Sequence, residues 1–112
     1  MKCTHVNTGV VLAESVEFAR TFGARLLGLM GRKSLAPRSA LLLEPCPQIH
    51  TCFMRFNIDV VFLDAQCRVV AVVQNVKPWR MSKFYSSARR TLEFPGGTLQ
   101  GRVQPGDELI FN

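Results

Sequence analysis

The stretch from residue 49 to residue 64 constrains the fold more than any other part of this sequence. It reads IHTCFMRFNIDVVFLD, and its β-branched and aromatic residues favour strand over helix. It is also too short and too polar to cross a bilayer. Yet a histidine, an arginine and an aspartate stand among these core-type residues, and an unpaired polar group costs several kcal/mol to bury. We therefore predict that this stretch forms the centre of a sheet and contains any functional site.

The second half of the stretch has the alternation of a strand that is covered on both faces. Successive side chains of a strand point to opposite sides, so an apolar set faces one way and a mixed set faces the other. The first set is Ile58, Val60 and Phe62, and the second is Asp59, Val61 and Leu63. Residues 64–67 then predict a four-residue hairpin loop, and residues 68–74 predict the partner strand.

Residues 15–30 predict a helix before this sheet centre. Apolar residues at positions 18, 22, 26 and 29 follow steps of four, four and three. Ser15 is a typical N-cap, and Glu17 places negative charge in the first turn, where it suits the helix dipole. Gly31 follows as a natural C-cap.

Short apolar runs separated by glycine and proline predict the remaining strands, near residues 6, 10–13, 40–44, 90–94 and 108–111. Pro45 and Pro47 interrupt regular pairing, because neither has a backbone N–H to donate. The chain shows no linker and no internal repeat, so we expect residues 1–112 to form a single domain. The predicted fold class is α+β and mostly β: a compact antiparallel, barrel-like sheet with one main packed helix.

Positive charge is concentrated in one interval of the chain. The net charge is +6, and residues 65–92 contain six basic residues and no acid. Such a local field attracts anions, whether nucleic acid, phospholipid head groups or an acidic protein face. No apolar run approaches the length of a membrane-spanning helix, and the N-terminus lacks the apolar core of a secretion signal. We therefore expect a cytoplasmic monomer with reduced thiols.

Four short segments read ARLLGLMGRKSL, ALLLEPCPQIHTCFMRFNIDVVFLD, TLEFPGGTL and PGDEL. In this order they resemble the DUF192 family, and the resemblance covers roughly residues 10–111. The resemblance implies a small β-rich domain with one packed helix, and it implies no activity. Two positions depart from the family pattern. Asn57 stands where relatives often have proline, and Cys67 stands where the hairpin loop often has glycine.

A polar cluster in the central stretch supplies the candidate ligand-binding residues His50, Thr51, Arg55 and Asp59. Arg55 and Asp59 lie four apart across a predicted bend, and a guanidinium and a carboxylate in a partly dry place would pair. His50 and Thr51 would complete the hydrogen bonds. Such a cluster either fixes the register of the central strands or lines a pocket for a small anionic or amide-bearing ligand.

Cysteine and histidine offer an alternative chemistry. Cys46, His50 and Cys52 have the spacing C-x3-H-x-C, which presents three soft metal ligands but is not a standard zinc knuckle. Either thiol could instead act as a nucleophile, with His50 as its base and Asp59 as the orienting group. No nucleophile signature accompanies them. A sulfur within hydrogen-bond reach of His50, beside an open cleft, would favour an enzyme.

The basic segment 77–90 is a second candidate contact surface, for an anion or a partner. Aromatic side chains interleaved with cations are what single-stranded nucleic acid or a lipid surface requires, but no RNA-binding signature is present. The candidate contact residues are Lys77, Trp79, Arg80, Lys83, Arg89 and Arg90.

The sequence favours a non-enzymatic binding or accessory module that needs no cofactor and takes a small ligand or a protein partner. A small Cys/His-dependent enzyme or metal-binding protein is the first alternative. A binder of nucleic acid or of an anionic surface, acting through the basic segment, is the second.

Overall fold

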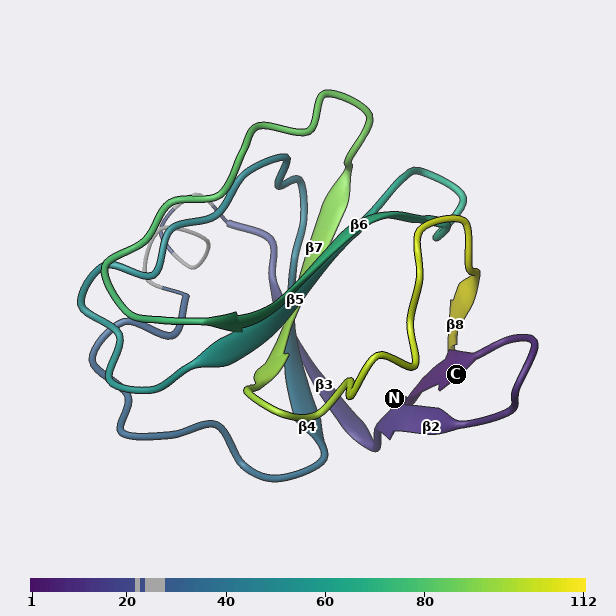
Figure 1. Cartoon of the computed structure of the whole chain (residues 1–112), viewed down its shortest axis with the longest axis horizontal. Coiled ribbons are helices and arrows are strands. Elements are labelled where there is room, and N and C mark those ends of the chain that lie inside the picture. Colours follow the sequence, from purple (N-terminus) through teal and green to yellow (C-terminus); the bar gives the residue numbers. More distant parts are fainter. Residues whose placement is uncertain (22, 24–27) are drawn as a thin grey trace.

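The computed structural model describes residues 1–21, 23 and 28–112, and the strands of these residues form two sheets (Figure 1). The larger sheet contains β3 (Ser15–Ala19), β4 (Ser39–Leu43), β5 (Ile58–Leu63), β6 (Val69–Val76) and β7 (Arg90–Pro95). The smaller sheet contains β1 (Cys3–His5), β2 (Val11–Ala13) and β8 (Leu109–Phe111). The strand orders are β3-β4-β7-β5-β6 and β2-β1-β8. Neighbours pair antiparallel except for β3 and β4, which run parallel.

Strand β5 is the centre of the hydrophobic core, and all of its residues are buried. Figure 1 shows the smaller sheet and the long loops on opposite sides of the larger sheet, which is therefore covered on both faces. The layer between the sheets, here called the intersheet core, contains Val61 and Leu63. The layer under the loops, the loop-side core, contains Ile58, Val60 and Phe62. This arrangement confirms the alternation predicted for this strand.

The helix predicted over residues 15–30 is wrong over residues 15–19, which form a strand, and over residues 28–30, which form a turn. Residues 15–19 form the edge strand β3, in parallel register with β4. Phe18, the first residue of the helical spacing, is exposed and lies against the guanidinium of Arg20, outside the core. Pairing with β4 supplies the backbone hydrogen bonds that a helix would have formed locally, so long-range contacts override the local pattern. Residues 22 and 24–27 of the predicted helix lie outside the described residues.

The predicted α+β, barrel-like fold class is therefore also wrong. The elements formed by the described residues are all strands, and neither of the two sheets closes on itself. Burial of both faces of the larger sheet comes from a second sheet and from loops, where we expected a helix and barrel closure. In the described part of the chain, no helix has the length and hydropathy needed to span a bilayer.

A tight loop joins β5 to β6 where the sequence predicts a hairpin. Oδ1 of Asp64 accepts hydrogen bonds from the N–H groups of Gln66 (2.8 Å) and Arg68 (3.0 Å). Cys67 has a φ angle of 61°, in the left-handed region that favours glycine. Cys67 thus keeps the turn that glycine often makes in relatives, but its β-carbon stands where the backbone conformation disfavours one.

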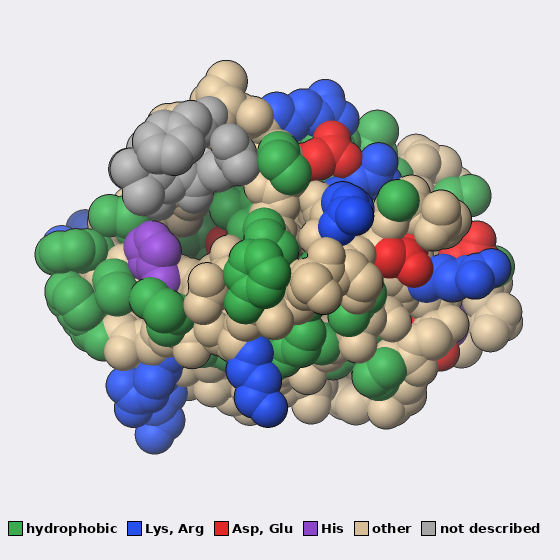
Figure 2. All heavy atoms as spheres, turned by 90° about the horizontal axis from the view of Figure 1, so that it is seen from above, with side chains coloured by type: hydrophobic (Ala, Val, Ile, Leu, Met, Phe, Trp, Pro, Cys, Tyr) green, Lys and Arg blue, Asp and Glu red, His purple; other side chains and the backbone are tan. Residues whose placement is uncertain are grey.

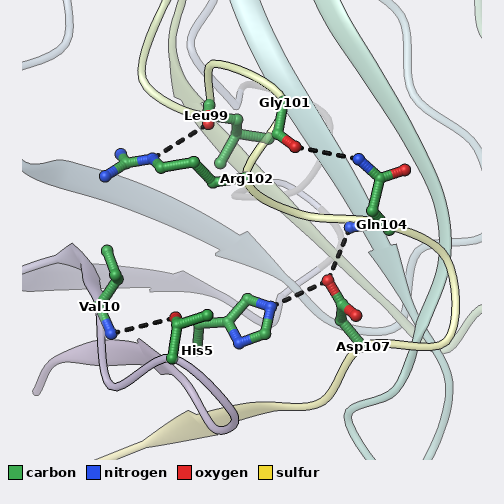
Figure 3. Close-up of polar contacts among 8 residues, drawn as sticks. His5, Val10, Leu99, Gly101, Arg102, Gln104 and Asp107 are labelled. Atoms are coloured by element: carbon green, nitrogen blue, oxygen red, sulfur yellow. Dashed lines mark hydrogen bonds and ion pairs between the residues drawn. The ribbon is translucent and has the colours of Figure 1, made fainter.

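A histidine–aspartate contact holds the smaller sheet against the turn that precedes β8. His5 Nε2 lies 2.9 Å from Asp107 Oδ2, and the same oxygen accepts the Gln104 N–H at 2.8 Å (Figure 3). The hydrogen bond from the backbone of Gln104, and then that from His5, lower the pKa of the Asp107 carboxyl. Strand β8 in turn pairs with β1, so the first and last strands of the chain are neighbours.

Asp59 is fully buried in β5 and is hydrogen-bonded both to the neighbouring strand β6 and to the segment that follows β7. Its Oδ1 accepts the Asn75 N–H and its Oδ2 accepts the Leu99 N–H, both at 2.9 Å. Backbone N–H groups buried without an acceptor are rare, because the loss of their hydrogen bonds to water is not compensated. The Asp59 carboxylate therefore takes the place of solvent for two main-chain amides.

We expect Asp59→Asn to destabilise the fold by about 2–4 kcal/mol, because its NH2 group must replace one of the two acceptors and face a backbone N–H. Asp64→Asn is the matched control. Both donors to Asp64 share Oδ1, which asparagine keeps, so its expected loss is below about 1 kcal/mol. Urea unfolding of the two variants measures the difference. Equal losses would contradict the role assigned to Asp59.

Candidate functional site

Two loops, residues 44–57 and 77–89, are hydrogen-bonded to each other, and the first contributes Cys46, Ile49 and Met54 to the loop-side core. The Thr51 N–H donates to the Arg80 carbonyl (2.8 Å), and the Trp79 N–H donates to the Thr51 carbonyl (3.0 Å). The buried Thr51 hydroxyl also donates to the Lys77 carbonyl at 2.7 Å and accepts the Arg80 N–H at 2.8 Å. Thr51, a predicted ligand residue, thus joins the two loops.

A cavity of about 50 Å³ lies within the loop-side core, under the first of these loops. Apolar residues form most of its wall, among them Leu29, Ile49 and Met54. Its polar and titratable lining residues are Cys46, Gln48, His50 and Glu93. The cavity therefore brings residues of one loop together with a carboxyl from the central strand β7.

Glu93 is the most unusual of these lining residues. It lies opposite Leu41 and Val60 in the sheet, so its side chain points into the loop-side core, and it is only 3% exposed. No residue in the described part of the chain donates a hydrogen bond to its carboxyl group. Burial raises the pKa of Glu93 to about 8, and the positive charge of Arg32 opposes this shift in part. Glu93 is therefore mostly protonated at neutral pH.

Sequence reasoning missed Glu93. The segment TLEFP alternates in the manner of an ordinary strand, in which an acid would be assigned to the solvent face. The one sequence feature that could have indicated a buried Glu93 is its place in a strand whose other side chains are apolar or small. That signal becomes specific only when β7 is known to lie between β4 and β5, with both of its faces covered.

His50 and Cys46 both line the cavity but do not form a nucleophile–base pair. His50 Nδ1 accepts the Cys52 N–H at 3.2 Å, and the Cys46 thiol donates to the Gln48 carbonyl at 3.1 Å. No hydrogen bond joins His50 to either thiol. Within the described residues, no three His, Cys, Asp or Glu side chains are grouped so that they could hold a metal. The set Cys46, His50 and Cys52 is thus not assembled as a metal centre.

The expected ion pair between Arg55 and Asp59 does not form. Arg55 is exposed and its guanidinium has no hydrogen-bond or ion-pair partner among the described residues. Asp59 faces the intersheet core, where Leu99 also lies, and both of its oxygens accept backbone hydrogen bonds. Of the four predicted ligand-binding residues, only His50 reaches the cavity.

Most cations of the basic segment face solvent. Lys77, Arg80, Lys83 and Arg89 are exposed, although Arg89 also donates to the Ser86 carbonyl at 3.0 Å. Arg90 differs, because it is half-buried and its guanidinium contacts the Glu44 carboxylate and the Cys67 sulfur. Arg90 therefore supports the fold, and the other four cations remain available to a partner.

We expect Glu93→Gln to remove a pH-dependent loss of stability. The pKa of Glu93 in the folded protein, about 8, lies above the ordinary glutamate value of 4.5, so the folded protein binds the extra proton between these values. The stability associated with this proton is complete below the lower pKa, falls as the pH rises through the interval, and is lost above the higher pKa. The wild-type chain should lose several kcal/mol over this window, at roughly 1.4 kcal/mol per pKa unit, and Glu93→Gln far less.

Urea unfolding between about pH 5 and pH 9 measures this difference. Glu108→Gln is the control, since Glu108 is exposed and its replacement should leave the wild-type pH profile unchanged. Parallel profiles for the wild type and Glu93→Gln would show that Glu93 does not carry the proton.

The DUF192 family, described as Uncharacterized ACR, matches residues 4–111. A UPF0127 protein of Pyrococcus furiosus is 36% identical over 115 residues, covering 96% of each chain. One of Pyrococcus horikoshii is 40% identical over 102 residues, covering 84% of each. A crystal structure from Novosphingobium aromaticivorans has a TM-score of 0.79 at 20% identity, over 99% of this chain and 93% of that one, which shows a shared fold. This chain belongs to the DUF192 family, whose curated relatives carry the name UPF0127.

Proposed function

We propose that this chain is a binding module whose cavity takes the cationic head group of a small molecule, such as a primary amine. The observation that carries the proposal is Glu93, a buried carboxyl that lines the cavity and has no hydrogen-bond donor from the described residues. A carboxyl in this setting stays protonated for lack of a counter-ion. A cation placed in the cavity would supply that counter-ion.

The size and lining of the cavity favour a small group. About 50 Å³ is room for roughly three water molecules, and therefore for an ammonium or methylammonium group but not for a drug-sized ligand. The apolar wall lowers the local dielectric constant, which strengthens the attraction between a cation and the ionised carboxylate. His50 uses Nδ1 for the Cys52 N–H, so its Nε2 is available to a polar atom of the ligand.

This proposal revises the ligand chemistry expected from the sequence. The central stretch predicts a pocket for a small anionic or amide-bearing ligand, lined by His50, Thr51, Arg55 and Asp59. Arg55 is exposed, however, and the cavity contains an acid. An anion beside Glu93 would raise the cost of ionising that carboxyl further. The alternative of a thiol enzyme has less support, since neither Cys46 nor Cys52 is hydrogen-bonded to the His50 ring through its sulfur.

Calorimetric titration of the wild-type chain with methylammonium tests the proposal. At pH 7 about nine-tenths of Glu93 carries a proton, and binding a cation ionises it, so nearly one proton should be released per ligand bound. Titrations in buffers with different ionisation enthalpies count this proton. Since the ionised fraction rises about tenfold from pH 7 to pH 9, the apparent affinity should rise by about the same factor.

Three further titrations serve as controls. Glu93→Gln should lose methylammonium binding, Glu108→Gln should keep it, and acetate should not bind the wild type. Binding that persists in Glu93→Gln, or that releases no proton, would contradict the assignment of Glu93 as the counter-ion.

A further inference from the structure

Four large apolar side chains, here called the aromatic tip, are exposed where the two hydrogen-bonded loops lie side by side. Their exposed fractions are 59% for Phe53, 58% for Trp79, 72% for Met81 and 64% for Phe84. Figure 2 shows hydrophobic side chains gathered at this end of the molecule, on the left in the view. Exposed apolar residues grouped in this way mark an interaction site more often than isolated ones do.

Two of these rings, Phe53 and Trp79, stand at unusual backbone conformations. Phe53 and Trp79 both have a φ of 64°, in the left-handed region that bulky residues rarely adopt. Main-chain hydrogen bonds hold both positions: the Phe53 carbonyl accepts the Gly31 N–H at 3.1 Å, and the Trp79 N–H donates to Thr51. Backbone conformations of this kind persist where the surrounding structure imposes them, and they are concentrated at functional sites. The backbone of the two loops therefore fixes the positions of Phe53 and Trp79.

The charge around the aromatic tip has a single sign. Lys77, Arg80 and Lys83 alternate with its residues along one loop, and all three are exposed. Arg55 follows Phe53 closely on the other loop and is also exposed. Residues 65–92 contain no acid that would neutralise this field. The partner must therefore combine negative charge with an apolar layer.

We propose that the aromatic tip docks onto an anionic lipid surface, with its apolar side chains in the boundary between head groups and acyl chains. Aromatic and apolar side chains flanked by lysine and arginine are the pattern of interfacial anchors. The cations would contact the phosphate and carboxylate groups of the lipids. This proposal is independent of the ligand assigned to the cavity.

The geometry of the rings favours lipid over single-stranded nucleic acid. Phe53 and Trp79 pack against each other with centroids 4.6 Å apart and an interplanar angle of 58°. Each ring therefore covers part of its neighbour, which leaves no pair of parallel faces for successive bases to stack on. Met81, the most exposed member, has no ring to stack but inserts readily into an apolar layer.

Trp79 is the single tryptophan of the chain, so its fluorescence reports on the tip alone. We expect phosphatidylcholine vesicles that contain phosphatidylserine to shift the Trp79 emission to shorter wavelength and to sediment the protein. Pure phosphatidylcholine vesicles should do neither. Lys77→Gln and Lys83→Gln should each weaken binding about fivefold, which corresponds to about 1 kcal/mol per basic residue near the surface.

The double variant Phe53→Ser, Met81→Ser keeps the reporter and should weaken binding at least tenfold, whereas Ile110→Ser, at an exposed apolar position on β8, should not. Unchanged thermal unfolding of each variant establishes that it is folded. Vesicle binding that the double variant retains would overturn the proposal, and so would absence of any spectral shift with anionic vesicles. Quenching of Trp79 by an oligothymidylate, without vesicle binding, would assign the tip to nucleic acid and overturn it as well.

Discussion

Pairing of β5 and β7 at the middle of the larger sheet leaves neither strand with a solvent-facing side, and the polar chemistry of the molecule follows from this constraint. Each strand carries one acid, and the two acids lie on opposite faces of the sheet. Asp59, on the intersheet face, accepts two backbone hydrogen bonds and is thereby stabilised as a structural group. Glu93, on the loop-side face, has no such donors from the described residues and borders a cavity. Two buried acids of the same sheet therefore differ: both oxygens of Asp59 accept hydrogen bonds, whereas the carboxyl of Glu93 has no donor among the described residues.

The loops over Glu93 connect the cavity to the protein surface. Thr51 fixes the loop that carries His50 to the loop that carries Trp79, and His50 itself pairs with Met81 through the backbone. The same few hydrogen bonds thus position a wall of the cavity and the aromatic tip. A change in one loop would be transmitted to the other, because the hydrogen bonds of the buried Thr51 leave the two loops little freedom to move independently.

Local patterns in the sequence located most of the strands, but they failed at residues 15–19 and at Glu93, whose structure is decided by distant partners. The alternation of residues 58–63 and the hairpin at Asp64 were correct, since both depend on neighbours along the chain. The apolar spacing that starts at Phe18 predicts a helix, yet residues 15–19 pair with β4, with Ser15 opposite Ser39, and this distant partner decides the outcome. The same limit hid Glu93, whose environment is set by strands on both sides. The asparagine at position 57, where relatives often have proline, does not affect the backbone contact made there. The Asn57 carbonyl accepts the Gly96 N–H, and the carbonyl of a proline would do the same.

The strand order also determines when the chain can complete its sheets during synthesis. Strand β7 lies between β4 and β5, so these two earlier strands cannot be joined until residue 95 has left the ribosome. Strand β1 has β2 on one edge but must wait for β8, which follows all the strands of the larger sheet, to cover the other. The β1–β2 and β5–β6 pairs, whose strands follow each other along the chain, can therefore form before β7 is made, and the nascent chain exposes the apolar surface of β4 and β5 until then.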